Sequence, residues 1–239
     1  FEFSPESHLE TVRQYSGKQY SNAEMEATIG AALASGCRKF DLFFMIGLPH
    51  QTPEIALDTV DYCRHLLQRF GNRITPFISP LAPFIDPGSL AYEQSEKLGY
   101  KILYRTLEQY RLALLQPSWK YTLGYETEWM SREEIVATTY EAALRLNRVK
   151  QESGLIDSEQ AGTIEERIHA AMKMMERIDE ILKIADCTLR EEALHRLKPA
   201  IDTLSIATIC GKDEIKWPAG KRRFNYFNII KDLLFGGRK

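Results

Sequence analysis

Residues 40–52 read FDLFFMIGLPHQT, and this stretch indicates the fold class of the chain. Apart from Asp41, the first seven are apolar, and such a run predicts a strand that is buried on both faces. At the end of this strand, Gly47 has no side chain and permits a ligand to approach the backbone closely. Pro49 turns the chain out of the sheet, and Thr52 followed by proline predicts the start of a helix.

The same pattern of a strand followed by a helix occurs on both sides of this stretch. Phe1–Phe3 predicts a short strand, and Ser21 with Glu24 has the spacing of a capping box at the start of a helix that ends near Gly36. Ile74–Ile78 predicts the third strand. Because successive strands that are joined by helices run in the same direction, the sequence predicts a parallel α/β sheet.

Beyond about residue 100 the sequence predicts helices and no further strands or antiparallel hairpin. Apolar residues recur at helical spacing over 103–115, 131–149, 164–184, 189–210 and 226–235. We therefore expect an α/β domain over residues 1–100 and an α-helical extension over residues 101–239.

The composition indicates an ordinary globular protein. Of 239 residues, 44% are hydrophobic and 27% charged, and the net charge of −2 gives no signal for nucleic acid or membrane. The closest approach to a basic cluster, Lys221-Arg222-Arg223, is interpreted as a solvated turn. No apolar run is long enough to span a bilayer and no signal peptide is recognised, so we expect a cytoplasmic protein. The cysteines are Cys37, Cys63, Cys187 and Cys210, too dispersed for a metal motif.

Three predicted strand ends carry polar or glycine-containing loops, which is where parallel sheets bind ligands. These are Ser4-Pro5-Glu6-Ser7, the run from Met45 to Thr52, and Ser79–Pro83 with Pro87-Gly88-Ser89 beyond it. Together with Lys18-Gln19-Tyr20-Ser21, they resemble strands four to six of the partial barrel of radical SAM enzymes, in which an IGLP-x-Q-T run follows strand five. The residue patterns of Glu2–Ser7 and Phe43–Pro49 are most similar to those of the branch that carries a cobalamin-binding domain. The resemblance covers residues 1–100.

The resemblance implies an incomplete (β/α) barrel and a cofactor. In that family a [4Fe-4S] cluster, held by three cysteines, reduces S-adenosylmethionine to a 5′-deoxyadenosyl radical, in reactions that include methyl transfer and methylthiolation. By position, Ser4 and Glu6 would bind the ribose or methionine groups. Met45 and Gly47 would lie along the adenosine, and Ser79 to Leu81 would contact adenine. Gly47→Val would then weaken cofactor binding more than folding.

The sequence also departs from the family. It lacks the Cx3CxxC motif, so the cluster ligands would lie outside this chain, which we expect to be inactive alone. His50 stands where glycine is commoner. Three βα units cannot close a six-stranded barrel, so we expect a missing N-terminal half as partner, which bears the first three strands and, in the branch with a cobalamin-binding domain, the cobalamin. Without that half, a free strand edge favours self-association.

Two other functions remain open on the sequence alone. One is a non-radical βα-barrel lyase with Glu6 or His50 as acid or base. The other is a helical interaction module, residues 100–239, on a degenerate α/β base.

Overall fold

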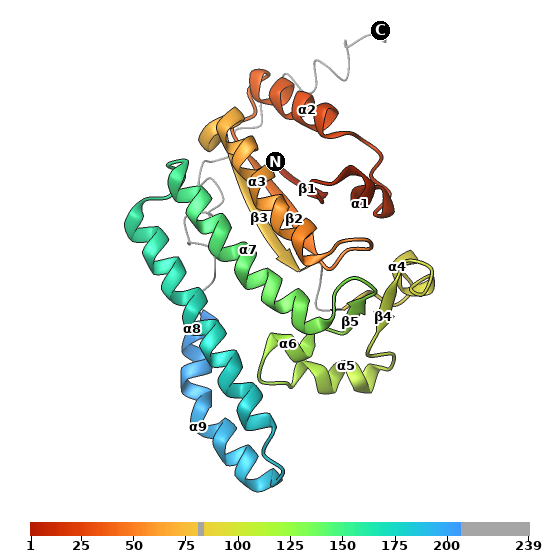
Figure 1. Cartoon of the computed structure of the whole chain (residues 1–239), viewed down its shortest axis with the longest axis vertical. Helices are drawn as coiled ribbons and strands as arrows, with labels where there is room; N and C mark the ends of the chain where they lie inside the picture. The colour runs from red at the N-terminus through yellow and green to blue at the C-terminus, as the bar shows by residue number, and fades with distance from the viewer. Residues whose placement is uncertain (81–83, 207–239) are drawn as a thin grey trace, which may run out of the picture. The chain divides into compact units, whose positions relative to one another are not determined.

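The computed structural model of the protein describes residues 1–80 and 84–206, with side chains to residue 203 (Figure 1). Its main sheet has three parallel strands in the order β1-β2-β3. They span Glu2–Glu6, Phe40–Ile46 and Ile74–Pro80. The predicted α/β class and the parallel sheet are therefore confirmed. Neither this sheet nor the two-stranded sheet described below closes into a barrel over the described residues.

Helices connect the three strands. Helix α1 (Glu10–Tyr15) and helix α2 (Asn22–Ala34) lie between β1 and β2, and helix α3 (Pro53–Phe70) with the short 3-10 turn Gly71–Arg73 lies between β2 and β3. The capping box predicted at the start of α2 is present. The Thr52 side chain caps α3 as predicted, by accepting a hydrogen bond from the backbone of Ile55.

Strand β2 is fully buried on one face only. Leu42, Phe44 and Ile46 are inaccessible to solvent, whereas Phe43 and Met45, on the other face, are half-buried. Phe43 stacks on Phe77 of β3 with ring centroids 4.9 Å apart. The prediction of a strand buried on both faces was thus too strong, because the second face is only partly covered.

The segment after β3 differs most from the prediction. It contains helix α4 (Leu90–Glu93), strand β4 (Tyr100–Ile102), helix α5 (Leu107–Leu114), helix α6 (Trp119–Thr122) and strand β5 (Tyr125–Thr127). Strands β4 and β5 pair antiparallel. The expectation that strands end near residue 100 was wrong, since strands of three residues are too short to show an alternating pattern.

Three long helices follow, much as predicted. They are α7 (Arg132–Glu152), α8 (Ser158–Leu182) and α9 (Cys187–Ile206), of which α7 packs on α3 and β3 and so joins the core of the sheet. The described residues belong to one compact unit. The helix predicted over 226–235, Cys210 and Lys221-Arg222-Arg223 lie outside the described residues. No described helix is both long and apolar enough to cross a membrane.

Candidate functional site at the strand ends

The carboxyl ends of the three parallel strands meet at one edge of the sheet. Glu6 pairs in register with Phe44, and Met45 pairs with Ser79, so predicted site residues from neighbouring strands come together. The Ser79 hydroxyl oxygen lies 3.9 Å from the Met45 sulfur. Leu81 lies outside the described residues. This edge is the candidate site.

Glu6 is the most unusual residue at this edge. Its φ of 67° lies in the left-handed region that few non-glycine residues adopt. The Lys18 ammonium donates to Glu6 Oε1 at 2.6 Å and also to the backbone carbonyl of Ser4. The Glu6 side chain is 14% exposed, and its second oxygen, Oε2, is buried without a hydrogen-bond partner among the described residues. The buried Oε2 of Glu6 is therefore an acceptor that makes no hydrogen bond among the described residues.

Two tyrosines, Tyr20 and Tyr100, lie close enough to Glu6 for its charge to affect their pKa values. Burial raises the pKa of Tyr20, and the Glu6 charge adds to that effect while Arg13 opposes it. Burial also raises the pKa of Tyr100, and the electrostatic effects of Tyr125 and Glu6 raise it further. Both tyrosines therefore remain protonated and can donate hydrogen bonds. A carboxylate with neutral phenols suits binding of hydroxyl or ammonium groups better than nucleophilic chemistry.

A buried arginine fixes the loop that carries Lys18 and Tyr20. Arg13 is fully buried, and its guanidinium donates to the carbonyl oxygens of Tyr20 at 3.1 Å and His8 at 3.3 Å, and to the Asn22 side chain. It also lies over the Tyr20 ring, 4.8 Å from the centroid. The sequence analysis missed this role, because a single arginine on a short helix gives no signal of burial.

Gln51 holds the loop after β2 in shape. Its fully buried carboxamide accepts from the backbone N–H of Gly47 at 2.9 Å and of Leu48 at 3.3 Å, and it donates to the carbonyl of Met45 at 3.0 Å. These bonds explain why an amide follows the Gly-Leu-Pro run. Gln51 belongs to the Gly-Leu-Pro-x-Gln-Thr run, but the sequence alone indicates no role for it.

Gly47 lies against Tyr125 of strand β5. Its φ is 90°, and a Cβ atom at this position would lie 2.7 Å from the Tyr125 hydroxyl oxygen. Tyr125 is fully buried. The space beside Gly47, which the resemblance assigns to adenosine, is thus filled by a side chain from a strand that the sequence did not predict.

His50 adopts a backbone conformation that few residues other than glycine adopt. Its φ is 60°, in the region where glycine is favoured. The imidazole lies between two aromatic rings, with centroids 4.1 Å from Tyr15 and 4.2 Å from Trp129. The Tyr15 ring is stacked on the imidazole and the Trp129 ring is tilted against it by 40°, so His50 connects α1 to the segment after β5.

No cluster of three or more metal-binding side chains is found among the described residues. Cys37 is half-buried, Cys63 is buried and Cys187 is exposed, and none is paired in a disulfide. Burial raises the pKa of the Cys63 thiol, which disfavours the thiolate that binds iron. The described cysteines do not fit an iron–sulfur cluster.

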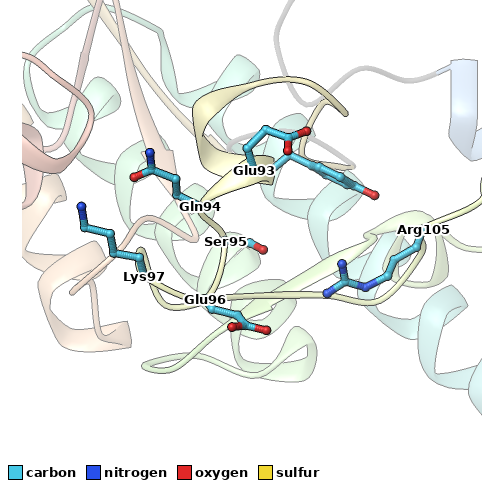
Figure 2. A pocket seen from close by; sticks show the side chains of 7 residues that line it. Glu93, Gln94, Ser95, Glu96, Lys97 and Arg105 are labelled. Atoms are coloured by element: carbon cyan, nitrogen blue, oxygen red, sulfur yellow. The ribbon is translucent and has the colours of Figure 1, made fainter.

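A separate depression lies beside α4. It has a volume of about 510 Å³ and is lined by Tyr92–Lys97 and Arg105, none of which is a predicted site residue. Figure 2 shows that the side chains of Glu93, Glu96 and Lys97 point in different directions instead of converging on one position. The depression is therefore an open polar surface without convergent side chains, and we keep the strand ends as the candidate site.

Comparison of the chain with protein-family models, with curated proteins and with solved structures finds no match. The function is therefore argued from the geometry of the strand ends.

Proposed function

We propose that this chain forms the nucleoside and methionine side of an S-adenosylmethionine pocket in a radical SAM enzyme. One observation carries the proposal: β1, β2 and β3 end side by side in a parallel sheet, with the unpartnered Oε2 of Glu6 at that edge. The chain order of the three loops also agrees with the resemblance in the sequence. Methyl transfer and methylthiolation are the reaction classes that the resemblance favours.

The residues at the edge fit the proposed cofactor in part. S-adenosylmethionine has ribose hydroxyls and an amino group, which can donate to Glu6 Oε2, and the Ser4 hydroxyl offers a further polar contact. Met45 supplies an apolar contact, and Ser79 supplies a backbone contact beside it. A direct contact between Gly47 and the adenosine does not fit the structure, because Tyr125 fills the space beside Gly47.

The chain's own residues would bind and orient the cofactor. Lys18 donates to one oxygen of Glu6, which would orient the carboxylate while its second oxygen binds. When bound, S-adenosylmethionine supplies the 5′-deoxyadenosyl radical after reduction by a [4Fe-4S] cluster. The ligands of that cluster, and any cobalamin, would belong to an N-terminal half outside this chain. We also propose a cytoplasmic location, where free thiols persist.

The test uses the parent protein, reconstituted without oxygen with iron and sulfide. We expect cleavage of S-adenosylmethionine to 5′-deoxyadenosine, measured by liquid chromatography. Glu6→Gln should raise the dissociation constant for S-adenosylmethionine about tenfold, because a hydrogen bond to a charged acceptor is weakened. The matched control is Glu2→Gln, on the exposed part of the same strand. No cleavage by a parent with about four irons per chain would contradict the proposal.

A further inference from the structure

Helix α5 presents an exposed leucine face. Leu107 is 83% exposed, Leu114 63% and Leu115 68%, and Leu112 is 46% exposed. Half of the strongly exposed large apolar side chains in the described part of the chain therefore lie between residues 107 and 115. Contiguous apolar surface of this kind marks a site of association.

The helix beneath this face is well anchored. Thr106 and Gln109 form a capping box at its start, and Ala113 is buried on the inner side. The Tyr110 ring packs edge-on against Phe84 at 5.2 Å and Tyr104 at 6.2 Å. The leucines thus project from a helix that is fixed on its other side.

The exposed face also carries one balanced pair of charges. Arg111 Nε donates to Glu108 Oε2 at 2.8 Å, and Arg111 Nη2 donates to Glu108 Oε1 at 2.7 Å. Both side chains are about 60% exposed. Since an α-helix advances about 100° per residue, the pair lies between Leu107 and Leu112 on one face. The two charges cancel, so the face offers no net attraction to an anionic membrane or nucleic acid.

We propose that this face binds a second copy of the chain, with the two α5 helices antiparallel about a two-fold axis. An axis midway between Glu108 and Arg111 sets Glu108 opposite Arg111 of the partner subunit, and the reverse contact follows by symmetry. The same register sets Leu107 opposite Leu112 of the partner subunit. Each charge therefore meets an opposite charge across the axis, and each of these leucines meets a leucine. A two-fold interface requires such a self-complementary surface.

Sedimentation velocity of the 239-residue chain over a concentration series tests this arrangement. We expect a monomer–dimer equilibrium that Leu107→Glu and Leu115→Glu each weaken about tenfold or more. Leu189→Glu is the matched control, since Leu189 is 55% exposed on α9 and lies outside the face. Circular dichroism confirms that each variant is folded, as expected for such exposed positions.

Charge exchange distinguishes this interface from a general apolar contact. Glu108→Arg or Arg111→Glu alone should weaken the dimer, because like charges then meet across the axis, and the double exchange should restore it. A monomeric wild-type chain, a dimer that is insensitive to Leu107→Glu, or a double exchange that restores nothing would overturn the proposal. So would a monomer that pellets with phosphatidylserine vesicles through Leu107 and Leu115. None of these readouts depends on S-adenosylmethionine.

Discussion

The hydroxyl of Tyr125 occupies the space that a side chain at position 47 would need. A Cβ atom on Gly47 would lie 2.7 Å from that oxygen and 3.1 Å from the ring carbon Cε2. The contact joins the end of a strand in the parallel sheet to the antiparallel β4–β5 pair. It gives Gly47 a role in folding, in addition to any role in binding.

Gly47→Ala should therefore lower the stability of the protein. The substitution puts an alanine at φ 90° and forces its Cβ against a buried tyrosine, so we expect the free energy of unfolding to fall by about 2–4 kcal/mol. Urea denaturation measures the change. The control is Gly162→Ala in α8, where a Cβ meets nothing within 4 Å, and where we expect a gain of about 0.5–1 kcal/mol.

This expectation changes how Gly47→Val is interpreted. The sequence predicts that the substitution affects cofactor binding more than folding, whereas the contact with Tyr125 predicts the opposite order. If Gly47→Ala leaves the unfolding midpoint unchanged, the contact carries no strain and the sequence-based interpretation is the better one.

Gln51→Leu should also destabilise the protein. The substitution leaves the backbone N–H groups of Gly47 and Leu48 and the carbonyl of Met45 without their partner, in a buried loop. Each unsatisfied buried group costs about 1–3 kcal/mol, so we expect a loss of about 3 kcal/mol or more in the free energy of unfolding. Gln68→Leu, at an exposed position on α3, is the matched control. Equal effects of the two substitutions would show that the loop does not depend on Gln51.

His8 should make the protein less stable as the pH falls. Burial, with a smaller effect of Arg13, lowers the pKa of His8 below its usual 6.5 despite the opposing charge of Asp58. The unfolded chain then takes up the proton first, so the free energy of unfolding decreases as the pH drops below about 6.5. His8→Gln should flatten this dependence between about pH 7 and pH 5.

The control for His8 is Thr59→Val. Thr59 Oγ1 lies 2.9 Å from His8 Nδ1, so this substitution removes a hydrogen bond but keeps the buried imidazole. It should lower the stability at every pH while the slope remains. An unchanged slope in His8→Gln would mean that His8 does not contribute to the pH dependence.

The sequence predicted the parts of the fold that are local. The caps at Ser21 and Thr52 and the parallel strands follow from patterns within a few residues, and the structure has them. Strands β4 and β5 were missed because three residues are too few for a periodic signal and their pairing is long-range.

At the candidate site, the predicted residues were those at the strand ends, and the missed ones make contacts across the chain. Tyr125 reaches Gly47 from a distant strand, and Arg13 is buried although its residue type favours exposure. Such contacts depend on how the elements pack, which spacing along a sequence does not encode.

The buried Gln51 side chain fixes the shape of the loop after β2 through hydrogen bonds to its backbone. Because the Gln51 carboxamide satisfies the backbone at three points, the path of the loop does not depend on the side chains of Leu48 or His50 for its hydrogen bonds. A ligand arriving at this edge would meet a surface that is already ordered, and little conformational entropy would be lost on binding. Among residues 47–51 only His50 is exposed, so a substitution there would change the surface that the loop presents while the hydrogen bonds of Gln51 stayed in place.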